Sequence, residues 1–342
     1  MSSEQLSMSP WLTRKFCRGL VGRASVPANS LLGEPWCPWC LGGKFFLTLI
    51  SCLLTFLVAI PPIHACTLFA AAGSTVRGGG VIIAKNRDRT PRGSVLKVLT
   101  PDDGYRQLDL VSTDNPAGPA VAGINEKGLV VVDASPSCLA QEEEVCNAVP
   151  LTQELLTRCA SVEEVLAQTH LLRASYPVFE MVADRHKVAW IEVAPEGLVA
   201  VSVIAQGALY HTNHYLDPRL SWANRKAYPS SKVRCRRIEQ LLSGQERSLT
   251  FADFLEFSQD RHSGPDNSLN RFGSTAVETR TLATFVVQLG EGAPHVFARM
   301  SNPGEADKVV NLVLEPELWH EGLRQKVKSC ESILTPGGIF LF

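Results

Sequence analysis

The residue with the clearest chemical potential in this sequence is Cys66, because it follows a segment with the features of an export signal. The apolar run at 45–60 carries no charge, Lys44 precedes it, and two prolines and then Ala65 come after it. A basic residue, an apolar core and a small residue at the cleavage position are typical of a secretory signal, whereas a membrane-spanning helix needs about 20 apolar residues. The sequence therefore predicts a presequence at 1–65, whose removal makes Cys66 the first residue of the mature chain.

Two alternatives concern this N-terminal segment. The run at 45–60 could stay uncleaved and anchor the protein in a membrane. The stretch at 1–43 is longer than a usual signal n-region, so either that region is extended or translation starts downstream of Met1. The predicted location is export, to the periplasm or the medium, with anchoring through 45–60 as the alternative.

An N-terminal cysteine has two known uses. In the first, the freed α-amine, which titrates near pH 8, takes the proton of the adjacent thiol, so that Cys66 acts as nucleophile and base without a histidine. In the second, the thiol carries a lipid, although the residue two positions earlier is then normally small and in this chain it is His64. The first use predicts an enzyme, and the second predicts an exported lipoprotein or binding module.

The residues after Cys66 predict a hairpin. Two apolar strands, at 67–72 and 81–84, flank a glycine-rich loop, and the second strand runs into Lys-Asn-Arg-Asp at 85–88. The loop length places Cys66 opposite residues 88–92. A carboxylate at that position would hold the α-ammonium group and a basic side chain would favour the thiolate, whereas the simpler alternative is an exposed, charged turn.

Four motifs follow one another along the chain: Cys-Thr at 66–67 with Lys-Asn-Arg-Asp at 85–88, Asn-Glu-Lys-Gly-Leu at 125–129, Thr-Asn at 212–213, and Ser-Ser-Lys-Val-Arg at 230–234. In this order they resemble the N-terminal-nucleophile linear-amide hydrolases, which include choloylglycine hydrolases, penicillin V acylases and relatives of isopenicillin N acyltransferase. The resemblance implies an α/β fold, a four-layer αββα sandwich with mainly antiparallel sheets. It also implies an enzyme that acts on carbon–nitrogen bonds of linear amides.

The same resemblance implies roles for four catalytic residues. Cys66 is the nucleophile and, through its α-amine, its own base, and Asp88 holds that amine in place. The side-chain amide of Asn213 donates to the oxyanion of the tetrahedral intermediate, a contact typically worth about 2.7–4 kcal/mol. Arg234 completes the polar network beside the nucleophile.

Two further residues depart from the pattern of bile salt hydrolases. Lys85 stands where those enzymes have an arginine, so the charge is kept and the bidentate geometry is lost. Ser135 stands where they have a second asparagine, which argues against a bile salt hydrolase in the narrow sense. Both are predicted to bind substrate or support the catalytic residues.

Some of these residues also have simpler explanations. Asn213 has His211, His214 and Asp217 as neighbours, but no second ligand pair accompanies the His-x-x-His spacing, so no metal or cofactor is predicted. Arg234 could belong to the solvated start of a helix.

The other cysteines say less about function. The Cys-x-x-Cys pair at 37–40 would be removed with the presequence. Cys138 and Cys146 flank a short acidic loop that a disulfide could close in an exported protein. Cys159 and Cys235 lie in helical patterns and are predicted to be buried thiols.

The remaining sequence predicts one α/β layered domain. Its expected helices are 151–160, 162–172, one that includes 236–242, and 251–259, its expected strands are 129–132, 178–183, 187–193, 198–204 and 208–211, and a closing hairpin joins 281–289 to 295–300. Residues 125–128 are expected to form a polar turn, and the polar loop at 260–272 could lie over an active site. Ser161, with Glu164 three residues later, predicts a capping box.

Composition limits the remaining possibilities. The chain has 342 residues, of which 45% are hydrophobic and 20% charged, and this is globular composition. Its net charge of −1 gives no electrostatic reason to expect a nucleic-acid partner. The length alone would allow two domains, but the presequence leaves one, at 66–342. The predicted substrate is a small-molecule N-acyl amide, and its acyl group and the oligomeric state stay open.

Overall fold

The computed structural model of this chain describes residues 65–139, 150–226, 229–320 and 322–331, all of which belong to one unit, Ile60–Phe342. The predicted presequence, its apolar run at 45–60, the pair at 37–40 and Cys146 lie outside the described residues. Their assignments therefore stay predictions. Among the described helices, each is too short or too polar to cross a membrane.

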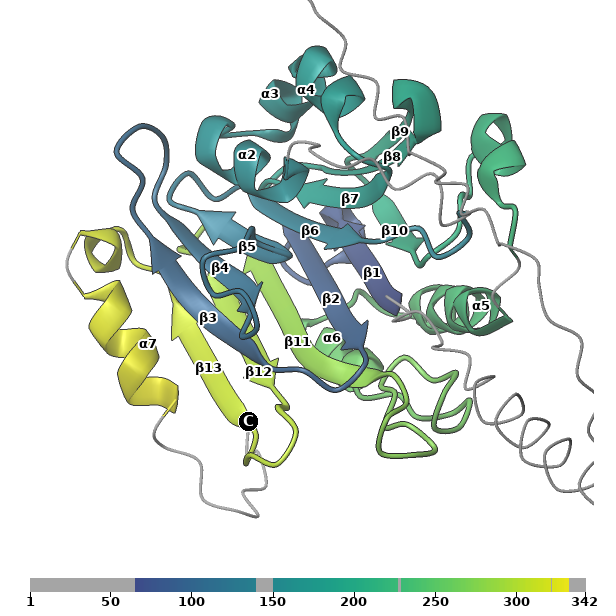
Figure 1. Ribbon diagram of the computed structural model, residues 1–342. Coiled ribbons are helices and arrows are strands. Elements are labelled where there is room, and N and C mark those ends of the chain that lie inside the picture. The colour runs from purple at the N-terminus through teal and green to yellow at the C-terminus, as the bar shows by residue number, and fades with distance from the viewer. Residues whose placement is uncertain (1–64, 140–149, 227–228, 321, 332–342) are drawn as a thin grey trace, which may run out of the picture. The chain divides into compact units, whose positions relative to one another are not determined.

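Two antiparallel sheets form the centre of the fold (Figure 1). The first sheet has the strand order β10 (Gly207–His211), β1 (Ala65–Ala72), β2 (Val81–Arg89), β11 (Arg280–Leu289), β12 (His295–Met300) and β13 (Lys308–Val313). The second has the order β3 (Ser94–Leu99), β4 (Gln107–Ser112), β5 (Ala122–Asn125), β6 (Val130–Ala134), β7 (Val178–Ala183), β8 (Val188–Ala194) and β9 (Leu198–Ile204). Each sheet packs against the other sheet on one face and against helices on its other face, which explains why several strands are continuous apolar runs.

Three apolar layers hold the sheets and helices together. The largest lies between the two sheets and joins residues such as Leu68 of β1 to Phe179 of β7. A second packs α2 (Leu151–Arg158), α3 (Val162–Ala167) and α4 (Thr169–Ala174) on the outer face of the second sheet. A third packs α5 (Pro229–Ser243) and α6 (Phe251–Ser258) on the first sheet, where Phe254 stacks on Phe69. The predicted four-layer αββα sandwich is therefore confirmed.

The β1–β2 hairpin is present, and its register differs from the prediction by one residue. Cys66 is opposite Arg87, and Ala65 is opposite Asp88. The stretch 85–88 is not a charged turn, because β2 continues through it and all four of its side chains are buried. Gly80 is required at the turn, since its φ is +79° and a Cβ there would lie 2.1 Å from the carbonyl oxygen of Leu289.

Most other predicted elements are found, several with the predicted limits. The helix expected at 162–172 is two helices, because Gln168 leaves the helical region with ψ of 46°. Ser161 caps α3 as predicted, but the Glu164 side chain accepts from Ala160 N instead of Ser161 N. Four strands were not predicted, β3, β4, β5 and β13, and neither was α7 (Leu323–Glu331), which lies against β13. The predicted closing hairpin is therefore followed by a further strand.

Candidate active site

The backbone of Cys66 is fixed at both of its polar atoms by side chains from distant parts of the chain. Its nitrogen donates to Oδ1 of Asn213 at 2.9 Å, and its carbonyl oxygen accepts from Nη1 of Arg234 at 2.6 Å. The residue is 7% exposed, and its side chain belongs to the apolar layer between the sheets. In the described chain this nitrogen is still a peptide nitrogen, bonded to Ala65.

Arg234 ties α5 to the first strand. Beyond its contact with Cys66 O, it donates to Thr67 Oγ1 at 2.8 Å and to Asn213 Oδ1 at 2.9 Å. Its Nη1 lies 4.0 Å from Oδ2 of Asp88, and both side chains are buried. Burial lowers the pKa of Arg234 to about 10, and Asp88 opposes that effect. The solvated helix start is therefore excluded for this residue.

Asn213 is held by a network just past the end of β10. Its backbone nitrogen donates to Ser231 Oγ at 2.9 Å, and its side-chain Nδ2 donates to Ser135 O at 2.8 Å. The preceding His211 contacts Oε1 of buried Glu192 at 2.7 Å. Glu192 was not predicted, although a charged residue inside an otherwise apolar strand is a signal that could have indicated it.

Asp88 lies on the opposite side of the sheet from the Cys66 thiol, on the side that α5 covers. Its Oδ1 accepts from Thr281 Oγ1 at 2.7 Å, and Oδ2 has no hydrogen-bond partner among the described residues. Burial raises the pKa of Asp88 to about 6, while Arg234 and Arg271 pull it down. In this state the acceptor for Cys66 N is therefore Asn213, and Asp88 is opposite the residue before it.

Lys85 approaches from the inter-sheet side. It forms an ion pair with Asp133 of β6 and donates to Val121 O at 2.6 Å, with only 1% of its side chain exposed. Burial raises the pKa of the Cys66 thiol, the Lys85 charge lowers it, and Asp133 and Asp88 raise it further. The cationic side chain beside the thiol thus opposes the effect of burial.

Two acidic residues near Lys85 were missed by the sequence reasoning. Asp133 pairs across strands with Glu180 of β7. Burial, and then the charge of Asp133, raise the pKa of Glu180 well above its usual range, and Thr152 Oγ1 donates to Glu180 Oε1 at 2.8 Å. The signal in the sequence is an acidic residue at the end of the apolar strand 130–132.

The structure brings Cys66, Asp88, Asn213 and Arg234 together, with Lys85 beside them. Ser135 contributes its backbone carbonyl, which is an acceptor and not the donor that a second oxyanion contact requires. Within the described residues there is no cluster of His, Cys, Asp and Glu that could hold a metal ion. His214, which raised that alternative, contacts Ser231 Oγ at 2.8 Å.

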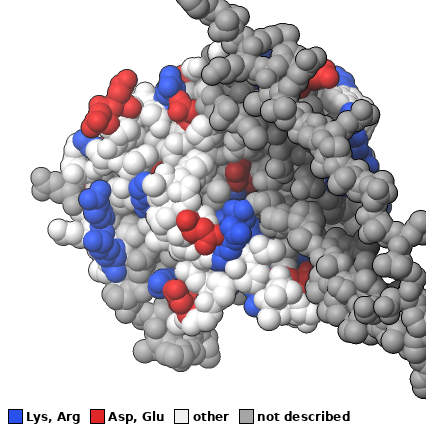
Figure 2. Space-filling model, viewed as in Figure 1, with Lys and Arg blue, Asp and Glu red and all other residues white. Residues whose placement is uncertain are grey.

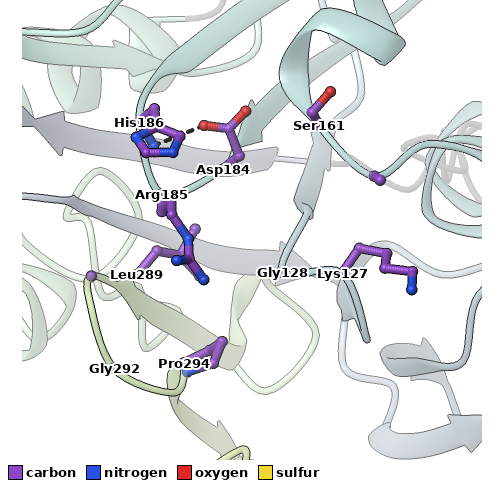
Figure 3. Close-up of a pocket in the computed structure, with 11 residues that line it drawn as sticks. Lys127, Gly128, Ser161, Asp184, Arg185, His186, Leu289, Gly292 and Pro294 are labelled. Carbon is purple, nitrogen blue, oxygen red and sulfur yellow. Dashed lines mark hydrogen bonds between the residues drawn. The ribbon is translucent and has the colours of Figure 1, made fainter. Parts of the chain in front are cut away.

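A separate pocket lies at the other end of the strands (Figure 3). Its volume is about 210 Å³, and the turns at 127–128, 184–186 and 289–294 supply most of its lining. Figure 3 shows Asp184 turned toward His186, and its Oδ1 accepts a hydrogen bond from the His186 backbone nitrogen at 2.8 Å. None of the predicted site residues lines it.

Comparisons with known proteins were made for the whole chain. The model of one protein family, described as acyl-coenzyme A:6-aminopenicillanic acid acyl-transferase, matches residues 75–296. No curated protein sequence matches the chain.

Solved structures similar to this chain include three amide hydrolases. Penicillin V acylase from Agrobacterium tumefaciens matches with 15% identity and a TM-score of 0.45, covering 73% of this chain and 86% of that one. A mutant of conjugated bile acid hydrolase from Clostridium perfringens matches with 16% identity and a TM-score of 0.45, covering 72% and 92%. The Caenorhabditis elegans N-acylethanolamine-hydrolyzing acid amidase ortholog matches with 12% identity and a TM-score of 0.47, covering 65% and 92%.

Proposed function

The chain belongs to the acyl-coenzyme A:6-aminopenicillanic acid acyl-transferase family, and from this premise we propose that it cleaves a linear N-acyl amide, or transfers its acyl group, through a thioester on Cys66. The observation that carries the proposal is the double hold on the Cys66 backbone, by Asn213 at the nitrogen and Arg234 at the carbonyl. Strand β10 pairs with β1 only as far as Leu68, so these two side chains hold the Cys66 backbone where β10 no longer does.

The first step is activation of the thiol. Cleavage after Ala65 turns the Cys66 nitrogen into an α-amine with an ordinary pKa near 8, which takes the proton from Sγ. The charge of Lys85 favours the thiolate. Asn213 Oδ1, already 2.9 Å from this nitrogen, accepts a hydrogen bond from the resulting ammonium group and orients it.

The thiolate then attacks the carbonyl carbon of the substrate amide, and the negative charge moves to the carbonyl oxygen. Nδ2 of Asn213 carries two hydrogens, of which Ser135 O accepts one, so the second is the proposed oxyanion donor. Collapse of the intermediate breaks the carbon–nitrogen bond, and the α-ammonium group gives its proton to the leaving amine. Water attacks the thioester in hydrolysis, or a second amine attacks it in acyl transfer, and the thiol is restored.

Two measurements test this proposal. N-terminal sequencing and intact mass of the purified protein should show a chain that starts at unmodified Cys66. A mass increment of a diacylglyceryl group would support the lipoprotein alternative instead and overturn catalysis at this thiol.

The second measurement is turnover of a panel of amides: penicillin V, conjugated bile salts, N-acyl homoserine lactones and N-acyl amino acids. Cys66→Ser should lose nearly all turnover of the best substrate. Cys159→Ser is the matched control, because Cys159 is a buried thiol at the end of α2, away from the site, and should keep its rate. Full activity in Cys66→Ser would refute the mechanism.

The proposal includes an exported protein with a small-molecule substrate, on the grounds of the predicted signal at 45–60. On the face shown in Figure 2, basic and acidic side chains of the described residues lie interspersed, and nothing there favours a polyanionic partner. Fractionation of expressing cells, with detection of the mature chain in the exported fraction, tests the location.

A further inference from the structure

Four arginines surround a cavity of about 270 Å³ on the helix side of the first sheet. Arg261 and Arg271 come from the loop after α6, Arg280 begins β11, and Arg299 lies near the end of β12. The four residues come from one stretch of the chain, 261–299, and the fold brings their charges to one space.

These guanidinium groups are poorly satisfied by the protein. Arg271 is 6% exposed, yet its Nε and Nη1 have no hydrogen-bond partner among the described residues. The Nε atoms of Arg280 and Arg299 are likewise buried without a partner there. Arg280 Nη2 donates to Thr275 O at 2.9 Å, which leaves its Nε and its charge uncompensated.

The positive charges of the four arginines are also not paired with carboxylates in the described part of the chain. Within the part of the chain that the structure describes, none of the four has a carboxylate oxygen within 4.0 Å of its guanidinium nitrogens. The acidic residue in the lining, Asp307, is exposed. Arg261 lies over the ring of Phe272, with 5.0 Å between its guanidinium carbon and the ring centroid.

Buried guanidinium nitrogens without hydrogen-bond partners lower the stability of the fold. A buried polar group without a partner typically costs about 1–3 kcal/mol, and more when it is charged. The four positive charges also repel one another, and the nearby carboxylates are Asp307 in the lining and buried Asp88, whose pKa Arg271 lowers. An anion with several acceptor oxygens would satisfy the free N–H groups and offset the charge, and the planar fork of arginine suits phosphate oxygens in particular.

We propose that this arginine pocket binds a phosphate group, either as the free ion or as a phosphate monoester. A dianion is preferred over a single carboxylate because of the excess positive charge. The inference does not depend on the amidase activity. The pocket is nevertheless adjacent to the site, because Thr281 lines it and also donates to Asp88 Oδ1 at 2.7 Å.

The test is calorimetric titration of the full chain with inorganic phosphate, and separately with phenyl phosphate, at constant ionic strength. The wild-type protein should show saturable binding at one site. Arg299→Gln should weaken binding at least tenfold, and Arg261→Gln, which changes an exposed side chain and leaves the core intact, should weaken it also. Tighter binding of phenyl phosphate than of inorganic phosphate would identify an ester as the ligand, and the reverse would identify the free ion.

Arg77→Gln is the matched control, because it removes the same charge from an exposed position at the β1–β2 turn. It should bind phosphate like the wild type. Arg299→Gln should also unfold at a urea concentration equal to or higher than the wild type without phosphate, because it removes a buried unpaired donor, and should lose the stabilisation that phosphate confers. Equal phosphate affinity in all variants, absence of saturable binding, or acetate binding as tight as phosphate binding would overturn the proposal.

Discussion

Replacing Asn213 by alanine would remove three hydrogen bonds from the centre of the candidate site. The side chain is fully buried, its Oδ1 accepts from Cys66 N and from Arg234 Nη2, and its Nδ2 donates to Ser135 O. Each buried group left without a partner typically costs about 1–3 kcal/mol, and the charged guanidinium stands at the upper end. We therefore expect Asn213→Ala to lower the free energy of unfolding by about 3–5 kcal/mol.

Asn213→Asp separates this structural role from the proposed chemical one. Aspartate keeps an acceptor for Cys66 N and Arg234, replaces the amide donor by a carboxylate oxygen that faces Ser135 O, and adds a negative charge beside Arg234. The free energy of unfolding should therefore fall by only about 1–2 kcal/mol. Both variants lack the donor proposed for the oxyanion, and both should lose about 10²–10³ in kcat. The two variants should thus differ in their free energy of unfolding and have a similarly reduced kcat.

The assays are urea unfolding followed by tryptophan fluorescence and kcat on the best amide of the panel. Asn125→Ala is the matched control, since Asn125 is also fully buried and its Nδ2 donates to two carbonyls, of Leu156 and Cys159, away from the site. It should be destabilised with kcat retained. A normal kcat in Asn213→Asp would refute the oxyanion role, and a loss below about 1 kcal/mol in Asn213→Ala would refute the structural reasoning.

Two further predictions concern the buried charges around Cys66. Because the folded pKa of Asp88 is raised to about 6, folding favours the protonated carboxyl, and this stabilisation is complete below the unfolded pKa and lost as pH rises through 6. Between about pH 4 and pH 7 the wild type should therefore lose about 2 kcal/mol relative to Asp88→Asn in urea unfolding, and parallel pH profiles would contradict the assignment. Lys85→Met leaves Asp133, whose side chain is 14% exposed, without its ion-pair partner and should lower the free energy of unfolding by about 3 kcal/mol, whereas the double variant Lys85→Met with Asp133→Asn should recover most of it. Equal free energies of unfolding of the single and double variants, measured by urea unfolding, would show that the ion pair does not stabilise the fold.

Local sequence predicted strands that are apolar runs, including β9, which lies at the edge of its sheet and of which only Ala200 is buried. Strands β7, β9 and β12 have the predicted limits, because each is an apolar run bounded by polar or turn residues. The predicted end of the second strand at residue 84 was wrong, since β2 continues through the polar stretch 85–88. Its polar residues indicate a strand end, but the strand continues because Lys85, Asn86 and Asp88 have partners far away in sequence. Arg87 has a partner close in sequence, Ser94.

The partners of Asn86 and Arg87 illustrate this point. Asn86 Nδ2 donates to Ser258 O at 2.9 Å and to Leu269 O at 2.7 Å. Arg87 Nη1 donates to Ser94 Oγ at 2.7 Å. The two contacts of Asn86 form only when α6 and the loop after it pack on the sheet, so the local sequence pattern cannot predict them.

The candidate site was predicted to the extent that family motifs mark it. The motifs indicated Cys66, Asp88, Asn213 and Arg234, which the fold brings together. They did not indicate Arg271, which lies in the polar loop at 260–272 and lowers the pKa of Asp88 against the effect of burial. The predicted position of that loop over the site agrees with this electrostatic effect, and the part that Arg271 plays in it came only from the structure.

Ala65 lies within β1, and this position limits when the proposed cleavage after Ala65 can take place. Ala65 is 2% exposed and pairs with Asp88, so the bond that joins it to Cys66 is enclosed once the sheet has formed. A peptidase cuts chains that are open to it, and a closed bond is cut only as often as the fold opens. If the chain is cleaved after Ala65, as proposed, the cleavage must take place while the chain is still unfolded, or a group already inside the fold must break the bond. A precursor that folds early would be sealed against any outside peptidase.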